Sequence, residues 1–539
     1  MMNHTRSVNP VLFQAFEWHT PSTPPTPHEK FSDSSHWARI KRLLPGLAPL
    51  GITAIWLPPG CKANDPCGNG YDCYDLWDLG EFDQKWARST KWGSREELDA
   101  IIQSAKELGI DCIWDAVLNH KTAGDATEVC WAVEVDPDNR CKDTCTPKQI
   151  ESWLQYDFPG RDRAGMPYST MKWRAEHFNG TDWDERSKKG AIYKIVDGPV
   201  SSNPLSRIAG KIKRDLLGKP GKDWADDVSN IHGNHDYLLF CNIYHKNPEV
   251  RQDLLKWGQW MVKDVGVKGF RLDAVQHFSY NFSREWVQHV QRSGPVFIVG
   301  EVWTHLTWRI LEWLDKVGPT ASAYDAPLLC NFSRIGEDVR NGSPNADLRT
   351  ILRDCLVTVR PDQAVTVVTN HDTQIGQTSF TPMYTPLKPL WYAFILLRKD
   401  GYPCVFWGDL YGTQGPHAEP PSCIKGEKKL IPELLRARQL FAHGPQTDYI
   451  DDAACIGWTR NDPEKGCAVV LSIAPEDETS TKKMKIGTSG EMWMDLLGDR
   501  EVCIDNNGEA EFPVSGRQVA VFVKKQELSP LEFDLNCGI

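Results

Sequence analysis

Eight short runs of β-branched and aromatic residues, separated by stretches with helical patterning, constrain the fold of this chain more than any other feature. The runs cover residues 11–16, 52–57, 111–117, 269–274, 296–301, 321–325, 364–369 and 402–407. Strands that are apolar on both faces and alternate with helices are typical of a buried parallel sheet. Eight such units favour an α/β fold in which the sheet closes into a (β/α)8 TIM barrel over an open doubly wound sheet.

Two of the intervening segments carry clear helix signals. Residues 94–108 open with Ser94 and have Glu97 three positions later, which is the spacing of a capping box. A second apolar-periodic segment runs from 248 to 265. Both segments therefore predict helices that pack on the outside of the barrel.

The regular alternation is interrupted between the third and the fourth strand. Residues from about 120 to 244 are polar, aromatic and rich in Gly and Pro, and they are too many for one connecting loop. We expect an inserted subdomain on the rim at the carboxyl ends of the strands.

The pattern changes again after a predicted helix at 431–440. Alternating runs at 466–472 and 518–523 predict a C-terminal antiparallel β-sandwich domain. The expected division is a first barrel part at 1–119, an inserted subdomain at 120–244, a second barrel part at 245–442 and a C-terminal β domain at 443–539.

Composition narrows the classes of partner and location. The chain has 61 Lys and Arg against 72 Asp and Glu, a net charge of −11, and no dense basic run, which argues against nucleic acid as a ligand. No apolar run approaches the roughly 18–20 residues that a membrane span needs. The first 16 residues lack a signal-peptide cleavage pattern, so we predict a cytoplasmic protein, and we expect a monomer.

Two residue types stand out in number. The 16 cysteines lack paired CxxC spacing, which predicts free thiols rather than a zinc site or a disulfide scaffold. The 22 tryptophans are expected to serve mostly as core packing, with some acting as flat platforms for sugar rings.

Polar residues follow the predicted strands where the active site of such a barrel lies. They come from four different strands: Asp115, Asn119 and His120; Arg271, Asp273 and His277; Glu301; and His371 and Asp372. Any one of them can be explained as a turn cap or as a partner for a buried charge. Their convergence on one rim favours a catalytic site.

Carboxylates on neighbouring strands suit glycoside hydrolysis with retention, in which one attacks the anomeric carbon and another protonates the leaving oxygen. Asp273 suits the ionised nucleophile, because Arg271 points to the same side of the strand and lowers its pKa. Glu301 suits the protonated acid, since Val299, Val302 and Trp303 flank it and give it an apolar setting.

The remaining polar groups at the rim suit contacts with the sugar. Asp372 is then free to grip hydroxyl groups and distort the ring, while His120 and His371 hydrogen-bond the same sugar.

Four segments resemble the four short regions of the α-amylase superfamily, glycoside hydrolase family 13, in the order of that family. They lie at 115–120, 269–277, 300–303 and 369–374. Further segments at 16–18, 70–82, 233–238 and 448–460 are similar to the liquefying-type α-amylases of bacteria and their intracellular fungal relatives. The resemblance covers nearly the whole chain.

The resemblance implies endo-acting hydrolysis of α-1,4-glucosidic bonds in starch, glycogen or maltooligosaccharides through a covalent glycosyl-enzyme intermediate. By it, Asp273 is the nucleophile, Glu301 the acid/base and Asp372 the transition-state stabiliser, with Tyr71 stacking on the sugar ring. The expected substrate-binding set is Tyr71, His120, Arg271, Gln276, His277, Trp303 and His371.

The resemblance also implies a structural calcium ion between the barrel and the inserted subdomain. The matching positions are Asn119, Asp236, Asn242 and the backbone carbonyl of His277. Asn242 and Tyr244 stand where the relatives usually have aspartate, so fewer ligands are charged. Because calcium affinity follows ligand charge, we predict one calcium that is held less tightly than in the relatives.

Gln276 also departs from the family pattern, because lysine commonly precedes this histidine. The change weakens charge-assisted contacts to sugars on the leaving-group side and bears on the product pattern.

Two alternatives stay open. A 4-α-glucanotransferase uses the same residues and passes the glycosyl unit to a sugar hydroxyl, and cell-wall α-glucan metabolism is a setting for such an activity. A non-catalytic glucan-binding protein is the other alternative, although such proteins lose at least one of the three carboxylates, and all three are present.

Overall fold

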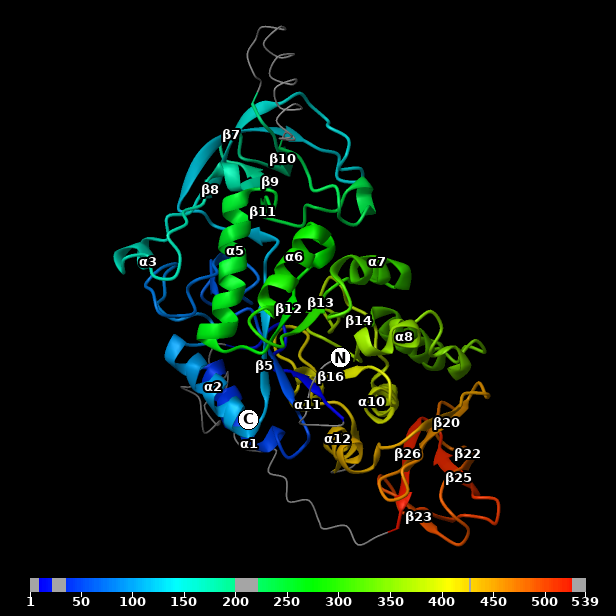
Figure 1. Ribbon diagram of the computed structural model, residues 1–539. Coiled ribbons are helices and arrows are strands. Elements are labelled where there is room, and N and C mark those ends of the chain that lie inside the picture. The colour runs from blue at the N-terminus through cyan, green and yellow to red at the C-terminus, as the bar shows by residue number, and fades with distance from the viewer. Residues whose placement is uncertain (1–8, 22–34, 199–221, 426–427, 526–539) are drawn as a thin grey trace.

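The computed structural model describes residues 9–21, 35–198, 222–425 and 428–525. The first eight residues, on which the cytoplasmic prediction partly rests, lie outside the described residues. Figure 1 traces the chain as a central barrel, an inserted sheet at one end of it and a separate C-terminal sheet at the other side.

The barrel contains all eight predicted strands. In chain order they are β1 (Leu12–Gln14), β2 (Ala54–Leu57), β5 (Asp111–Ala116), β12 (Gly269–Leu272), β13 (Phe297–Gly300), β14 (Ala321–Tyr324), β15 (Ala364–Val367) and β16 (Tyr402–Phe406). Neighbouring strands are parallel, and β1 pairs with both β2 and β16, which closes the sheet. The strands are shorter than the predicted runs, whose outer residues, such as Phe16 and Ile52, lie in the connecting segments.

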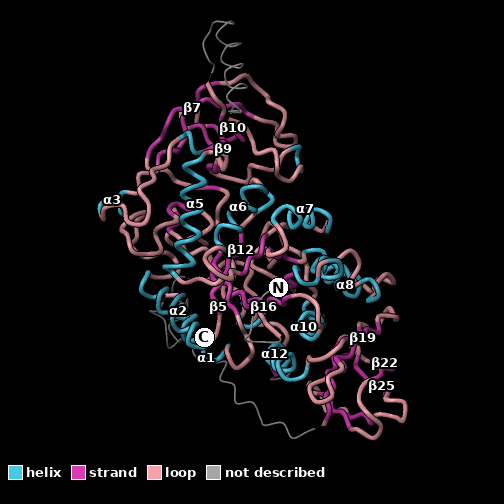
Figure 2. Tube along the Cα trace, viewed as in Figure 1, coloured by secondary structure: helices cyan, strands magenta, loops and turns pink. Residues whose placement is uncertain are grey.

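Helices surround the barrel, as the cyan tubes around the magenta centre of Figure 2 show. They are α1 (His36–Leu47), α2 (Arg95–Leu108), α5 (Pro248–Trp260), α6 (Tyr280–Gln291), α7 (Thr307–Val317), α8 (Ala326–Arg340), α9 (Leu356–Val359), α10 (Lys388–Leu397), α11 (Trp407–Tyr411) and α12 (Leu430–Phe441). The capping box at Ser94 is present, with both of its hydrogen bonds to Glu97. The predicted helix at 248–265 is α5 followed by one π-helical turn, Met261–Val265, which ends at Gly266.

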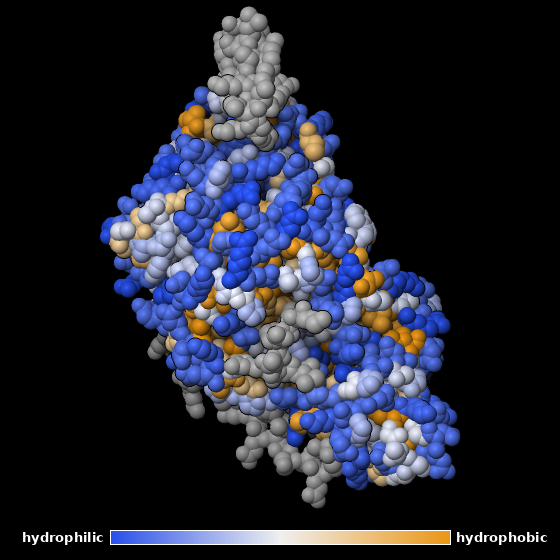
Figure 3. All heavy atoms as spheres, viewed as in Figure 1, coloured by the Kyte–Doolittle hydropathy of each residue, from blue (hydrophilic) through white to orange (hydrophobic). Residues whose placement is uncertain are grey.

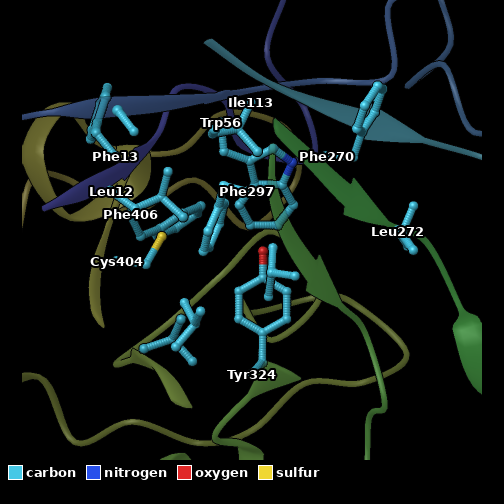
Figure 4. Close-up of a cluster of buried hydrophobic side chains, with 14 of the residues drawn as sticks. Leu12, Phe13, Trp56, Ile113, Phe270, Leu272, Phe297, Tyr324, Cys404 and Phe406 are labelled. Atoms are coloured by element: carbon cyan, nitrogen blue, oxygen red, sulfur yellow. The ribbon is translucent and has the colours of Figure 1, made fainter. Parts of the chain in front are cut away.

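The inside of the barrel is packed with large apolar side chains. Figure 4 shows Trp56, Phe297 and Tyr324 gathered at the centre of this cluster from three different strands. These side chains are buried, and the Trp56 and Tyr324 ring centroids lie 5.6 Å apart. The barrel is therefore a filled core, and polar chemistry is confined to its rim.

The insertion after β5 forms a six-stranded antiparallel sheet. Its strands, in spatial order, are β6 (His120–Lys121), β11 (Cys241–Ile243), β9 (Phe178–Asp184), β10 (Lys189–Ile195), β7 (Ala126–Glu134) and β8 (Lys148–Gln155). The short helix α3 (Pro159–Arg163) follows β8, and a small hairpin of β3 (Lys62–Ala63) and β4 (Cys73–Asp75) lies in the loop after β2. This sheet confirms the predicted insertion after the third barrel strand.

The C-terminal region confirms the predicted antiparallel β domain. One sheet contains β19 (Gln446–Tyr449), β20 (Cys455–Arg460), β21 (Cys467–Ser472), β26 (Gln518–Lys524), β23 (Met492–Asp495) and β24 (Glu501–Cys503). A second, two-stranded sheet contains β22 (Thr479–Lys485) and β25 (Glu509–Ser515). Phe512 and Phe522, one from each sheet, pack 5.1 Å apart between ring centroids and belong to one buried cluster.

Outside these units lies the short hairpin of β17 (Ile424–Lys425) and β18 (Lys428–Lys429). The face drawn in Figure 3 is mostly hydrophilic, with apolar residues in scattered patches. Within the described ranges, no helix combines the length and the apolar character that crossing a membrane requires. The cysteines of the described residues are all free thiols. The exact boundaries of the three predicted domains stay a prediction.

Candidate active site

The acidic residues predicted at the strand ends meet at one point of the barrel rim. The strand pairing continues one residue past β12 and β13, because the Asp273 N–H donates to the Ala116 carbonyl and the Glu301 N–H donates to the Leu272 carbonyl. Asp273 and Glu301 therefore leave neighbouring strands at the same level, with Asp115 beside them on β5.

A single buried guanidinium binds these three acids. Nη1 of Arg271 lies 2.8 Å from Oδ1 of Asp115 and 2.7 Å from Oδ1 of Asp273, and Nη2 lies 2.7 Å from Oε2 of Glu301. The Glu301 carboxylate also accepts the Ala274 N–H at 3.0 Å. Ala274 has a left-handed backbone (φ +48°), which turns its N–H towards Glu301.

The electrostatics of the site differ from the prediction in one respect. Burial raises the pKa of Asp273 above its ordinary value, and Arg271 opposes that rise without overcoming it. The predicted influence of Arg271 thus has the right sign, but the net lowering expected for Asp273 is wrong because desolvation outweighs it. Burial also raises the pKa of Glu301, as predicted, and the Asp273 charge adds to the rise while Arg271 opposes it.

A layer of stacked rings supports the acids from one side. Tyr71 and His371 stack with ring centroids 5.4 Å apart and 6° between their planes, and Trp18 stacks on both. The Tyr71 hydroxyl donates to Asp115 at 2.9 Å, and it lies 2.7 Å from Nε2 of His371. Burial lowers the pKa of His371 well below its usual range, so the ring is neutral.

Asp372 follows His371 and reaches the same space. Its Oδ2 lies 3.3 Å from Nε2 of His371, and its N–H donates to the Asn370 side chain. Burial raises the pKa of Asp372 well above its usual range, and the charge of Glu301 raises it further. The three candidate catalytic carboxyl groups therefore form one coupled electrostatic unit.

These groups face a cavity of about 560 Å³ at the rim, which we call the rim cavity. Its lining residues are Trp18, Asn69, Tyr71, Asp72, His120, Leu238, Leu239, Phe240, Asp273, Ala274, Gln276, His277, Glu301, Trp303, Asp372, Thr378 and Ser379. The structure thus brings together every predicted catalytic and substrate-binding residue except two. Arg271 and His371 do not line the cavity and act instead on groups that do.

Other lining residues were not predicted as site residues. Trp18 and Asp72 lie in segments that carry the family resemblance, so that signal was available for them. Phe240 belongs to the insertion, and it packs against His120 with ring centroids 5.6 Å apart. Nothing in its local sequence indicates that it returns to the rim.

A second cavity of about 400 Å³ adjoins the first, and we call it the insertion cavity. Phe240 lines both cavities. Trp153 and Trp183 line the insertion cavity as well, and both indole N–H groups point to Oε2 of Glu185, at 3.4 and 2.7 Å. Thr122, Ala123 and Gly124 form another part of its wall.

The predicted calcium residues lie together between the barrel and the insertion. Nδ2 of Asn119 is 2.7 Å from the His277 carbonyl, 3.3 Å from Oδ1 of Asn242 and 3.5 Å from the Asp236 carbonyl. Three oxygens thus converge on one side-chain amide. The buried Oδ1 of Asp236 has no hydrogen-bond partner.

On its other side, the Asn119 amide oxygen faces the His120 ring, which has too few N–H groups for its two acceptors. Oδ1 of Asn119 faces Nδ1 of His120 at 3.1 Å, while Nε2 of that ring lies 2.8 Å from the Tyr71 carbonyl. Burial lowers the pKa of His120 to about 4, so the ring is neutral and has one N–H for two acceptors. Rotating the amide, whose O and N positions are interchangeable, satisfies His120 and places four oxygens around one point. That arrangement fits a hard cation such as calcium.

Comparisons with known proteins agree with this geometry. The family model described as "Alpha amylase, catalytic domain" matches residues 32–195 and 224–468.

The chain belongs to the α-amylase family of glycoside hydrolases.

Three relatives match this chain along almost their whole length. The α-amylase of Bacillus licheniformis is 37% identical over 96% of this chain and 94% of its own. The cytoplasmic α-amylase of Escherichia coli is 36% identical over 96% of this chain and 99% of its own. The glucan 1,4-α-maltohexaosidase of Bacillus sp. strain 707 is 36% identical over 97% of this chain and 94% of its own.

Solved structures support the fold. The α-amylase of Geobacillus thermoleovorans, solved in complex with acarbose, has a TM-score of 0.57 at 16% identity and covers 97% of this chain and 100% of its own. At that identity the likeness concerns the α-amylase fold alone.

Proposed function

We propose that this α-amylase is an endo-acting, retaining enzyme that cleaves α-1,4-glucosidic bonds through a covalent glycosyl-enzyme intermediate. Asp273 is the nucleophile, Glu301 the general acid and base, and Asp372 the group that stabilises the transition state. The observation that carries the proposal is the bridge formed by Arg271, which holds Asp273 on one terminal nitrogen and Glu301 on the other.

This bridge supports retention rather than inversion. Two carboxylates that share one guanidinium lie close together, and retaining enzymes have their carboxyl groups about 5–5.5 Å apart. Inverting enzymes need about 6.5–9.5 Å, so that a water molecule fits between carboxylate and sugar. The shared guanidinium therefore favours the shorter of these two separations.

The steps follow from the position of each group. Oδ of ionised Asp273 attacks the anomeric carbon while protonated Glu301 gives its proton to the glycosidic oxygen, and the sugar on the leaving side departs with that proton. Glu301, now ionised, then removes a proton from water, and the resulting attack on the anomeric carbon releases Asp273. Arg271 favours the ionised form of both carboxylates, which suits the nucleophile and also the second role of Glu301.

The other rim residues hold the sugar at the reacting position. Asp372 reaches the cavity beside the acids, and Tyr71 offers an aromatic face fixed by its contacts with Asp115 and His371. His120 lies on the same wall. On the leaving-group side, Gln276, His277 and Trp303 contact the departing chain.

The two cavities, which share Phe240 in their walls, support a long substrate bound along its length. A glucan that occupies the rim cavity continues past Phe240 onto Trp153 and Trp183, whose flat faces suit sugar rings. Binding on both sides of the cleavage point is what endo action requires. Starch, glycogen and maltooligosaccharides are the proposed substrates.

We further propose one structural calcium held by Asn119, Asp236, Asn242 and the His277 carbonyl. Among the described residues, no group of three or more His, Cys, Asp and Glu side chains has a metal-binding arrangement, so the site relies on amide and carbonyl oxygens. When bound, the ion supplies positive charge that fixes the insertion against the rim. It takes no part in the bond cleavage.

A cytoplasmic monomer is the proposed physiological form, with an α-glucan and neither nucleic acid nor membrane as partner. A relative that is named a cytoplasmic α-amylase and matches 99% of its own length supports the location.

The deciding experiment follows the products from maltoheptaose and soluble starch over time, with calcium present and with Glu301→Gln as the inactive control. Shorter products in the α-anomeric form, absent from the control, are expected. Products longer than maltoheptaose would move the assignment to 4-α-glucanotransferase with the same residues in the same roles. No turnover of either substrate would contradict catalysis and leave a glucan-binding protein.

A further inference from the structure

A tight turn in the loop after β4 has an unusual composition. Gln84 and Ala87 exchange backbone hydrogen bonds of 3.3 and 3.4 Å, so Lys85 and Trp86 form a two-residue turn. Both turn residues have a positive φ, +49° for Lys85 and +67° for Trp86. Such turns favour Asn and Gly, because other side chains are strained in this region by about 1 kcal/mol or more.

The strained residue at the turn is also the most exposed large apolar residue of the described chain. Trp86 is 93% exposed, whereas Trp308 and Trp153 are 54% and 41% exposed. An indole left in water gains none of the stabilisation that burial gives. Neither the backbone nor the packing of the protein alone therefore explains a tryptophan at this position.

A buried lysine, Lys62, holds the backbone of this turn. The ammonium of buried Lys62 donates to the carbonyls of Phe82, Ala87 and Arg88 at 3.1, 2.8 and 2.6 Å. It also lies 3.4 Å from the Asp78 carboxylate. The backbone of the turn that carries Trp86 is thus held by a buried charge.

The second turn residue ties this turn to the insertion cavity. The Lys85 ammonium donates to the Ala123 carbonyl at 2.6 Å and lies 4.1 Å from the centre of the Tyr74 ring. Ala123 lines the insertion cavity, and Trp153 and Trp183 line it as well. Trp86 is the chain neighbour of Lys85, so the Lys85 contact links the turn that carries Trp86 to the wall of that cavity.

We propose that Trp86 is a remote sugar-binding platform for the outer part of a long α-1,4-glucan whose inner part lies in the rim and insertion cavities. The proposal rests on the proposed function and adds that polymeric glucan is the preferred substrate class. An aromatic face stacks on the C–H face of a glucose ring, and a fixed platform loses little conformational entropy on binding.

The surroundings of Trp86 favour a carbohydrate over an apolar partner. Asp83 and Arg88 are exposed near the turn, and both side chains offer hydrogen bonds to sugar hydroxyls. A single indole among charged side chains is far smaller than the contiguous apolar patches that mark protein or membrane contacts. A glucan chain that leaves the insertion cavity at Ala123 is the occupant that matches this position.

The test compares Trp86→Gly with the wild type on amylose and on maltotetraose. Gly suits a positive φ, so the variant is expected to keep or raise the melting temperature, and a merely structural role for Trp86 predicts the opposite. We expect kcat/KM on amylose to fall about three- to tenfold, the size of one lost stacking contact, with no change on maltotetraose. Trp86→Phe is expected to restore most of the loss.

Trp308→Ala is the matched control, because it also removes an exposed indole but lies on α7. It is expected to leave the ratio of amylose to maltotetraose activity unchanged. If the ratio of amylose to maltotetraose activity in Trp86→Gly equals that of the wild type, the proposal is overturned. If the wild type turns over neither substrate, the proposed function fails, and this result is distinct because it does not depend on the variant.

The binding itself can be followed separately from turnover. In a Glu301→Gln background, migration through native gels that contain glycogen reports affinity for the polymer. Adding Trp86→Gly is expected to weaken the retardation by a similar three- to tenfold factor. Equal retardation of the two proteins would contradict a platform role.

Discussion

At the scale of single residues, one cation controls the charge of the site. Arg271 is buried and contacts Asp115, Asp273 and Glu301 at once. Removing any of these acids changes the electrostatic environment of the others, because they share one partner in a region of low dielectric constant. The effects of substitutions in this group are therefore expected to be non-additive.

The acid role of Glu301 can be separated from the nucleophile role of Asp273 by the choice of leaving group. Glu301→Gln removes the transferable proton, so its kcat/KM on starch should fall by about 10²–10⁴-fold. On α-maltosyl fluoride the loss should be much smaller, because fluoride leaves without protonation. Initial rates on the two substrates give the comparison.

Asp273→Asn supplies the control for this comparison. Without a nucleophile it should be inactive on both substrates. Equal losses on starch and on the fluoride in Glu301→Gln would contradict the assignment of Glu301 as the acid.

The sequence predicted the residues of the site better than their contacts. The residues at the strand ends could be named because barrel topology places those ends together. The contact of Arg271 with Asp115 depends on the strand register, which places these two residues opposite each other on β12 and β5. The register between strands so far apart in sequence is set by the packing of the whole barrel. The burial that raises the pKa of Asp273 depends on the same packing, so it could not be predicted from the sequence.

At the scale of secondary-structure elements, Asp325 joins two helices. It caps α8 by accepting the Leu328 N–H, and it also accepts the N–H groups of Leu356 and Val357 at the start of α9. Burial raises the pKa of Asp325 to about 6, although the three N–H groups oppose the rise. The carboxyl group therefore holds its proton to a higher pH in the folded protein than in the unfolded chain.

This shift predicts a pH-dependent stability. The contribution of protonated Asp325 is complete below the unfolded pKa of about 3.9 and is lost as the pH rises through about 6. Between these values the group contributes a slope of at most about 1.4 kcal/mol per pH unit. Asp325→Asn should be less stable overall but should show a shallower slope, measured by urea unfolding between pH 4 and 7. Parallel slopes would show that another group titrates.

Lys62 gives a prediction for the loop between β4 and α2. Lys62→Met leaves Asp78 without its cation and removes the donor for the carbonyls of Phe82, Ala87 and Arg88. Breaking such a buried pair costs about 3–5 kcal/mol of the free energy of unfolding. Lys85→Met, at a half-buried position, is the control and should cost clearly less. Urea unfolding of both variants tests the difference.

The helices and strands were predictable to different degrees. The capping box of Ser94 and Glu97 located the start of α2, because it is a local signal. The π-helical turn after Trp260 has no comparable signal, since it depends on how the chain reaches β12. The predicted barrel strands extend too far, because the apolar pattern continues into buried residues such as Phe16 and Ile52 that lie outside the ladder.

At the scale of the whole molecule, the residues of the proposed calcium site come from both the insertion and the barrel. Asn119 precedes β6, Asp236 and Asn242 belong to the insertion, and His277 follows β12. An ion bound by all of them stabilises the folded state only, so calcium at 100 times its Kd should add about 2.7 kcal/mol. Chelation is therefore expected to lower the melting temperature, as scanning calorimetry can measure.

The number of charged ligands sets the strength of this site. Asn242→Asp adds a formal charge and should tighten calcium binding, as isothermal titration of the stripped protein can measure. Two or more tight sites in the wild type would contradict the single weak calcium.

The domain plan could be predicted from the sequence, but the topology of the insertion could not. Its first strand, His120–Lys121, pairs with its last, Cys241–Ile243, across almost the whole inserted segment. Local patterns contain no information on such pairing. Consequently the return of Phe240 to the rim, where it lines both cavities, could not be predicted from the sequence.

The pairing of β1 with β16 also bears on how the protein is made. Phe13 lies opposite Val405, so one edge of the first strand stays open until nearly four hundred further residues have left the ribosome. At about 5–20 residues per second this wait lasts about 20 to 80 seconds. An unpaired, apolar strand edge invites pairing with other chains during that time. The closed barrel thus leaves the growing polypeptide with an aggregation-prone edge until its eighth strand arrives.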